Sequence, residues 1–264
     1  MSAARSEPAS LEAASLEPVP PAVAPPTATP QVEARRTLPG YGAVFWAVLG
    51  KDVRTELRSK ETLATMGLFG AVMTFVLAFG FVSDPATNRR ILPGALWVAL
   101  LFVGTLGVGR TFAREARDDA FAALVLAPAH RSAILLAKMS GNLLLSLLVL
   151  ALVGPLLAVM LHVELTAAET GPVALALVLG AMGFAVVGTP LAVMAVNARF
   201  AEVLLPMVVF PLVSPVLISG VTASGVLLGT NVGADAWGYL QLMLAFNVAF
   251  GVGGLFLFER MVTE

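Results

Sequence analysis

The sequence predicts an all-α integral membrane protein with six transmembrane helices, and three observations carry this prediction. Apolar residues make up 58% of the 264 residues and charged residues only 12%, and the mean hydropathy is +0.89. Six apolar runs are each long enough to cross a hydrocarbon core of about 30 Å at roughly 1.5 Å per residue. Lys and Arg are concentrated on one side of these runs, which sets the orientation of the chain.

We expect the spans at residues 63–82, 91–109, 139–162, 172–196, 203–219 and 237–258. Of the 16 Lys and Arg residues, 14 fall on the side that also holds both termini, and only Arg89 and Arg90 fall on the other side. Because basic residues accumulate in cytoplasmic loops, both termini are predicted to be cytoplasmic. The chain is therefore expected to be a multi-pass membrane protein.

Residues 1–39 differ in composition from the rest and are expected to be a disordered, Pro/Ala-rich cytoplasmic tail. They hold eight of the 17 prolines and almost no aromatic residues, so they bury too little apolar surface to offset their chain entropy. No apolar core follows Arg5, which excludes a signal peptide. Residues 40–264 form the predicted membrane domain.

The net charge of −1 indicates no nucleic-acid partner, and the absence of cysteine excludes thiolate metal sites.

An amphipathic segment, 43–60, precedes the first span. Phe45, Leu49, Val53 and Leu57 recur every four residues, and charged residues fill most of the positions between them. This spacing predicts a helix in the plane of the membrane interface, with Trp46 at headgroup depth. A simple membrane anchor and a moving part are both compatible with the pattern.

The longest charged stretch, "RTFAREARDDAFAALVLAPAHRSAILLAK", lies on the cytoplasmic side at 110–138. At about 100° per residue, its charged side chains fall on one face and small residues fall on the opposite face. We expect a short helix over 112–128 that lies across the cytoplasmic mouth and ends at Pro128. Two roles are open at this point: the helix folds onto headgroups or the bundle, or it docks a cytoplasmic protein partner.

Several kinds of chemistry are missing from the sequence. The pattern G-x-x-x-x-G-K-[ST], whose amides cradle nucleotide phosphates, does not occur, so this chain is not expected to hydrolyse ATP by that route. His130 and His162 lie on opposite sides of the membrane and are not expected to share a metal. His162, at the outer end of the third span, is a candidate heme contact, although an interfacial polar role is more usual. The span centres carry almost no ionisable residues, which disfavours an ion-driven carrier.

Proline and glycine also mark the later spans. Three prolines in "LLPMVVFPLVSPVLISG" predict a bent helix, a helix with a short re-entrant piece, or ordinary kinks in a bundle. Six glycines leave shallow helix faces that are consistent with a dimer interface: Gly104, Gly107, Gly109, Gly180, Gly183 and Gly188.

Two stretches of the sequence resemble the heme exporter protein B family. They are "GALWVALLFVGTLGVGRTFAREARDDAFAALVLAPAHRSAILLAKMSGNLL" and "GFAVVGTPLAVMAVNARFAEVLLPMVVFPLVSPVLISGVTA", and the likeness runs from about Val44 to the C-terminus. The central motif of the first stretch runs from Arg110 to Pro128 as "R-x-x-A-R-E-x-x-D-x-x-x-x-x-L-x-x-A-P", with Lys138 after it, and is shared loosely with many six-helix permeases of ABC transporters. The "VGTPLAVMA" run of the second is more specific to this family.

The resemblance implies an ABC-2-type exporter permease that serves cytochrome c maturation. It implies two copies of the chain with two ATPase subunits, a heme-handling membrane protein, a small helper peptide and a periplasmic heme chaperone. ATP would be bound by the partner ATPase, heme would be cargo, and this chain would be noncatalytic. The segment 112–128 would be the coupling helix, with these candidate ATPase contacts: Arg114, Glu115, Arg117, Asp118, Asp119, Phe121, Leu124 and Pro128.

The sequence lacks the Trp-rich signature of the heme-handling partner family, because Trp46, Trp97 and Trp237 stand alone. We therefore expect a mechanical role, in which the coupling helix transmits ATPase closure to release of the heme-loaded chaperone. Two alternatives remain at this point. One is a permease of the same architecture that exports a lipid, glycan or drug, and the other is a nonconducting structural scaffold.

Overall fold

The computed structural model describes residues 39–81, 84–118, 130–195, 201–231, 233 and 235–261. At 110–118, 201, 202 and 261 it describes the backbone alone. All but the last residue of the expected tail, 1–39, falls outside these ranges, as do residues 119–128 of the expected coupling helix. The fold below is that of the unit that starts at Leu38.

Seven helices and no strand occur in the described ranges. They are α1 (Tyr41–Ser59), α2 (Glu61–Gly80), α3 (Pro85–Asp118), α5 (Arg131–Met160), α6 (Ala167–Met194), α7 (Ala201–Leu227) and α8 (Ala236–Met261). Six of these, α2 to α8, are long and apolar enough to span a membrane. The predicted all-α, six-span architecture is therefore confirmed, and α1 corresponds to the predicted amphipathic segment.

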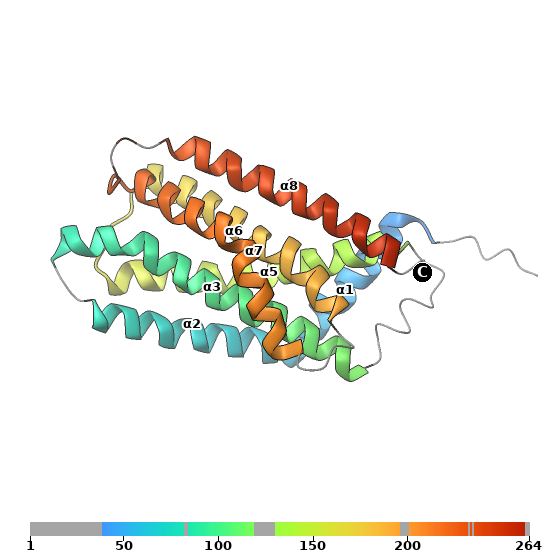
Figure 1. The fold of residues 1–264 in the computed structure, drawn as a ribbon. Helices are drawn as coiled ribbons and strands as arrows, with labels where there is room; N and C mark the ends of the chain where they lie inside the picture. The colour runs from blue at the N-terminus through green and yellow to red at the C-terminus, as the bar shows by residue number, and fades with distance from the viewer. Residues whose placement is uncertain are drawn as a thin grey trace, which may run out of the picture. The chain divides into compact units, whose positions relative to one another are not determined.

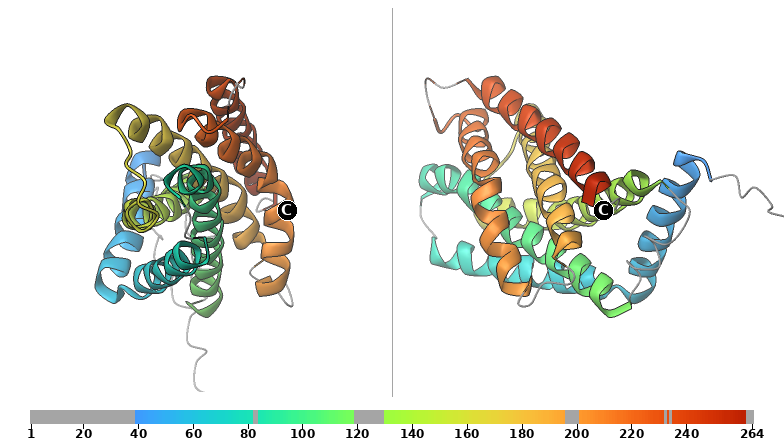
Figure 2. Two further views of the ribbon diagram at one scale, coloured as in Figure 1. Left: turned by 90° about the vertical axis from the view of Figure 1, so that its left-hand side faces the viewer. Right: turned by 45° about the vertical axis from the view of Figure 1, so that its right-hand side comes forward.

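The six long helices run roughly along one axis, and α1 lies at one end of them (Figure 1). The loops that follow α2, α5 and α7 meet at the opposite end, which is the outer end in the predicted orientation. The C-terminal end of α8 is on the same side as α1 (Figure 2), as the distribution of Lys and Arg requires. The two ends of the bundle therefore differ: α1 and the C-terminal end of α8 lie at the predicted cytoplasmic end, and the three loops lie at the predicted outer end.

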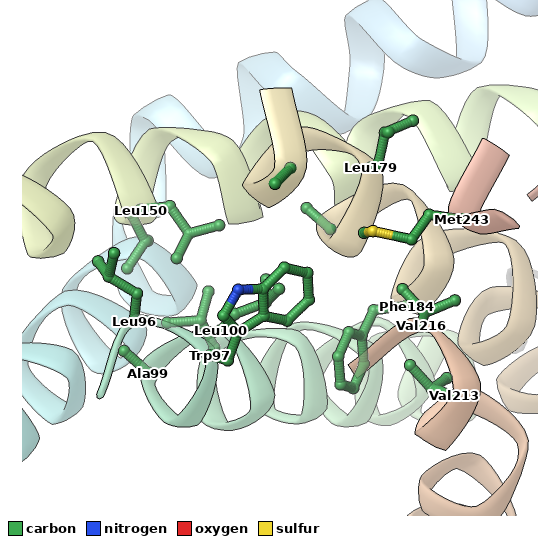
Figure 3. Packing of buried hydrophobic residues seen from close by; sticks show 14 of the residues in the cluster. Leu96, Trp97, Ala99, Leu100, Leu150, Leu179, Phe184, Val213, Val216 and Met243 are labelled. Atoms are coloured by element: carbon green, nitrogen blue, oxygen red, sulfur yellow. The ribbon is translucent and has the colours of Figure 1, made fainter. Parts of the chain in front are cut away.

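The core lies where α3, α5, α6, α7 and α8 meet. Trp97 and Phe184 are fully enclosed there, between side chains from neighbouring helices that include Val216 and Met243 (Figure 3). Large apolar side chains on the outward faces of α2, α7 and α8 remain exposed in the single chain. In a membrane such faces meet acyl chains, because lipid replaces water as the solvent.

Helix α7 contains Pro206, Pro211 and Pro215 and is nevertheless one continuous helix. It bends in Figure 1, which agrees with a bent helix or with ordinary kinks in a bundle, whereas the re-entrant alternative is wrong. Proline removes the amide that would bond the carbonyl four residues earlier. The carbonyl that Pro215 leaves without this bond belongs to Pro211, and the Ser214 hydroxyl donates to it at 2.8 Å. A local hydroxyl thus replaces the missing amide, which explains why the helix continues.

Candidate functional site

Helix α3 joins the two ends of the molecule that carry charge. It runs for 34 residues from Pro85 to Asp118, or about 51 Å at roughly 1.5 Å per residue. The hydrocarbon core needs only about 30 Å of this length. The helix therefore projects beyond the membrane at its cytoplasmic end, into the charged segment.

The start of the expected coupling helix is part of α3. We predicted a separate helix over 112–128, and this is wrong for its first part, because 112–118 are the last turns of α3. The physical reason is that the stretch after Gly109 is rich in the helix formers Ala, Arg and Glu and contains no proline to end the helix. One glycine costs only about 1 kcal/mol and does not break it.

The candidate ATPase contacts divide accordingly. Arg114, Glu115, Arg117 and Asp118 occupy the cytoplasmic end of α3, where the backbone alone is described. The remaining four lie outside the described residues: Asp119, Phe121, Leu124 and Pro128. Their role in ATPase contact stays a prediction.

The outer end of α3 is fixed by Arg89. Its Nε donates to the carbonyl of Leu228 at 3.1 Å, and its Nη1 donates to the carbonyl of Glu164 at 3.0 Å. Its Nη2 forms an ion pair with the Glu169 carboxylate at the start of α6. One guanidinium therefore ties α3 to the α5–α6 loop, to α6 and to the end of α7. We call Arg89 with these three partners the outer clamp.

Two neighbours of Arg89 strengthen this end of α3. Asn88 is buried and its amide donates to the carbonyl of Leu161 at 2.9 Å. Asp84 is the N-cap of α3, and its Oδ1 accepts from the amides of Ala86 and Thr87 at 3.1 Å each. The Thr87 hydroxyl, at 2.6 Å from Oδ2, and then these amides hold the pKa of Asp84 below its ordinary value.

Glycines in the middle of α3 and α6 let these helices approach closely. A Cβ added at Gly104 would lie 2.5 Å from the Phe184 ring, and one at Gly188 would lie 2.3 Å from Val108. One at Gly180 would lie 2.6 Å from the Trp97 ring. The glycines that we associated with a dimer interface therefore pack within one chain, except Gly109, which faces no atom within 4 Å. Periodicity shows a shallow face but does not show what covers it.

A polar seam crosses the interior beside these glycines. The Asn142 amide of α5 donates to the Thr189 hydroxyl of α6 at 3.4 Å, and both residues are buried. The Asn142 Oδ1 lies 2.6 Å from the position that a Cβ of Gly107 would take. Among the described residues this oxygen has no hydrogen-bond donor, so the missing side chain of Gly107 is what leaves room for it. The seam links α5 to α3 and α6 without any ionisable group.

Helix α1 is fastened to the bundle rather than free on the membrane surface. The Nζ of Lys138 on α5 lies 3.6 Å from Oδ2 of Asp52 on α1, and the lysine side chain is only 3% exposed. The buried carboxylate of Glu56 accepts from the amide of Leu63 at 2.9 Å and so caps α2. A single left-handed residue, Lys60, separates α1 from α2. These contacts disfavour a loosely attached anchor.

The predicted interfacial residues divide between two faces of α1. Phe45, Leu49 and Val53 are half-buried, whereas Trp46 and Leu57 are exposed, as lipid-facing residues of an interfacial helix would be. Pattern reasoning missed the anchoring carboxylates, Asp52 and Glu56, because charged positions were assigned to solvent. The signal that identifies Asp52 and Glu56 is their position around the helix axis, since each lies between two of the apolar positions.

His162 occupies the turn that ends α5. Its φ of 54° is left-handed, and its amide donates to the carbonyl of Val159 at 3.0 Å. The amide of Val163 donates to the carbonyl of Ala158 at 2.9 Å, which completes a Schellman cap. The imidazole is exposed at the outer end. The described ranges hold no cluster of three or more His, Cys, Asp or Glu residues around a common point. A heme contact at His162 stays a prediction.

Comparisons of the sequence with known proteins match it to one family. Residues 43–259 match the family model described as CcmB protein. Heme exporter protein B of Pseudomonas aeruginosa is 30% identical over 75% of this chain and 86% of its own length. The Paracoccus denitrificans protein of the same name is 30% identical over 77% of this chain and 91% of its own. The Haemophilus influenzae protein of that name is also 30% identical, over 78% and 90%.

The match begins within α1 and ends within α8, so it covers all six spanning helices and leaves out the Pro-rich tail. Its relatives are bacterial, and the helices are those of a multi-pass protein of the bacterial inner membrane. The chain belongs to the CcmB protein family of membrane permease subunits.

Proposed function

We propose that this chain is the permease subunit of an ABC transporter for cytochrome c maturation. It couples ATP hydrolysis by a partner ATPase to heme delivery or to release of the heme-loaded periplasmic chaperone. The relatives named heme exporter protein B support the heme-related role. The observation that carries the coupling role is the length of α3, a single helix of 34 residues from the outer clamp to the charged cytoplasmic segment.

A rigid helix of this kind transmits movement from one side of a membrane to the other. The last turns of α3 lie in the segment that we propose docks the ATPase, so closure of the ATPase displaces this end. The glycine contacts at Gly104 and Gly188 are too close to allow α3 to slide freely along α6. The displacement therefore moves α3 and α6 together and reaches the outer clamp.

At the outer end, the outer clamp passes this movement to the neighbouring loops and so changes the surface that they form. Arg89 contacts the α5–α6 loop and the end of α7, so a shift of α3 changes the positions of both. These outer segments are short, and they are the surface that a periplasmic chaperone would meet. Heme is the cargo of the complex in this proposal, and no heme-bound step in this chain is required.

The partners follow from the chemistry that this chain lacks. The sequence has no phosphate-binding loop, so a partner ATPase supplies ATP binding and hydrolysis to this noncatalytic chain. The family resemblance implies two copies of each subunit. A heme-handling membrane protein, a small helper peptide and the periplasmic heme chaperone complete the proposed assembly.

The first experiment tests docking. Wild type and the double variant Asp118→Arg with Leu124→Asp are compared for co-purification of the ATPase, for ATP hydrolysis and for chaperone release. We expect the double variant to reach the membrane and to lose all three. If it retains the ATPase and the release step, 112–128 is only a membrane-surface segment and the proposal is wrong.

A second variant separates docking from transmission. Thr111→Pro interrupts α3 between the membrane and the docking segment, at a cost of about 3 kcal/mol to the helix, and Thr111→Ala is its matched control. We expect Thr111→Pro to retain the ATPase but to lose ATP-dependent release, because the interrupted α3 no longer transmits movement of its cytoplasmic end to the outer clamp. Normal release by the proline variant would contradict the role of α3 as the transmitting element.

A further inference from the structure

A lateral groove opens at the outer end between α2, α3 and the end of α7. Its volume is about 490 Å³, which lies within the roughly 300–1,000 Å³ of typical small-molecule sites. The walls are mainly apolar and come from Leu77 of α2, Pro93 and Val98 of α3 and Val221 of α7. Helices α2 and α7 both pack on α3, so the groove lies over α3 between them, within the part of the bundle that is apolar enough to be in the membrane.

The outer rim of the groove is polar. Arg90 lines it and is exposed, and among the described residues no hydrogen bond or ion pair is found for its guanidinium. All three nitrogens of its neighbour Arg89 bond within the outer clamp, so among the described residues that line the groove Arg90 is the cation available to a ligand. Thr230 and Asn231 complete the rim. Both amides donate to the carbonyl of Gly225, at 2.8 and 3.1 Å, which folds the α7–α8 turn over the groove.

The groove is amphiphilic, because its charged and apolar lining residues lie at different depths along α3. Arg90 is near the start of α3, at the boundary of the apolar span, and Val98 is eight residues further along the helix. At roughly 1.5 Å per residue this places Val98 about 12 Å deeper than Arg90. A ligand that fills the groove therefore meets a positive charge at headgroup depth and apolar walls at acyl-chain depth.

We propose that this groove binds one phospholipid of the outer leaflet, with its phosphate on Arg90 and an acyl chain along Leu77, Val98 and Val221. The single cation favours a lipid with one anionic phosphate. A polyanionic ligand is disfavoured because Glu164, Asp84 and Asp235 add negative charge to the outer loops. The proposal is independent of heme delivery, since it uses no residue of the coupling segment.

The test is native mass spectrometry of the full chain with its ATPase, titrated with phosphatidylglycerol, phosphatidylcholine or water-soluble glycerol phosphate. Wild type is expected to retain one phosphatidylglycerol per chain. Arg90→Gln should weaken this binding by roughly tenfold, as expected for loss of one charge-assisted hydrogen bond. The matched control is Arg58→Gln, an exposed cation on α1 at the opposite end. Equal binding by the two variants would overturn the assignment of the phosphate to Arg90.

A second pair of variants tests the apolar part. A Cβ at Gly94, which lines the groove, meets no atom within 4 Å, so Gly94→Leu fills the groove without a clash at its Cβ. Gly67→Leu on α2 is the control, because its Cβ is equally unobstructed. Gly94→Leu is expected to weaken binding of both lipids by at least fivefold and to keep the ATPase bound. Unchanged lipid binding by Gly94→Leu, or glycerol phosphate that competes as well as the lipid, would refute a lipid groove.

Discussion

The buried indole of Trp97 leaves no room for a side chain at Gly220 of α7, so even a change of this glycine to alanine is expected to destabilise the fold. The ring is held between Gly180 of α6 and Gly220 of α7, and its Nε1 donates to the Ser224 hydroxyl at 3.0 Å. A Cβ at Gly220 would lie 1.9 Å from Cζ2 of the ring. The substitution Gly220→Ala therefore forces either the indole or α7 to move.

The size of this effect follows from the overlap. Carbon atoms in contact are separated by about 3.5 Å or more, so the alanine methyl is roughly 1.6 Å too close. The ring has little room to move, because it also packs closely on Gly180, where a Cβ would lie 2.6 Å from it. Overpacking of this kind costs roughly 1–3 kcal/mol, and a rigid ring in close contact with two helices places Gly220→Ala near 3 kcal/mol. Loss of the Ser224 hydrogen bond would add to the cost.

The assay is the free energy of unfolding in mixed micelles, followed by circular dichroism. Gly253→Ala is the matched control, because its Cβ meets no atom within 4 Å, and it should change stability by less than about 1 kcal/mol. Trp97→Phe combined with Gly220→Ala should recover part of the loss, since the smaller ring leaves room for the methyl. The packing argument is refuted if Gly220→Ala is as stable as Gly253→Ala, or if the double variant shows no recovery.

Three further predictions concern two helix caps and one ion pair between helices. Asp84 has a pKa below the ordinary value of 3.8, so its cap stabilises the fold above that pH and the contribution is lost as the pH falls through the lower, folded-state pKa. Unfolding curves should therefore show an advantage of wild type over Asp84→Asn at pH 6 that disappears in strong acid, and a constant difference would contradict this. His162→Gly should raise stability by about 1 kcal/mol, because glycine adopts a left-handed φ without strain, whereas His162→Ala should not; equal stability of the two would contradict the cap. Asp52→Asn should cost roughly 1–3 kcal/mol by weakening the partnership of the buried Lys138 ammonium, and adding Lys138→Met should restore much of it; a double variant as unstable as the single one would exclude this ion pair as the cause.

Much of the fold could be read along the chain. Each predicted span corresponds to one observed helix, and about half of the ends coincide within three residues. Helix α3 extends well beyond the prediction at both ends, α5 at its cytoplasmic end and α7 at its outer end. The amphipathic segment before the first span is α1, and the proline-rich run is a bent helix. Span length, apolar content and the positions of Lys and Arg are properties of local sequence, because the membrane acts on each segment separately.

The candidate site could be predicted only in part. The charged segment was assigned a separate helix from residue 112, but α3 continues through 118, since the pattern does not distinguish a new helix from the extension of an old one. The glycines of α3 and α6 were consistent with a dimer interface, and all of them except Gly109 instead pack against other helices of the same chain. Residues 119–129 lie outside the described ranges, so the assignment of ATPase contacts there rests on the family resemblance.

The sequence by itself determined six spans, their orientation and the class of protein, because hydrophobic length and charge act locally. Tertiary structure decided which residues meet. Arg89 binds the carbonyl of Leu228, 139 residues further along the chain, and Trp97 lies between two glycines from different helices. The burial of Lys138 beside Asp52 likewise depends on how α1 crosses α5. No local pattern encodes these contacts, because each depends on the angle and register at which whole helices pack against one another.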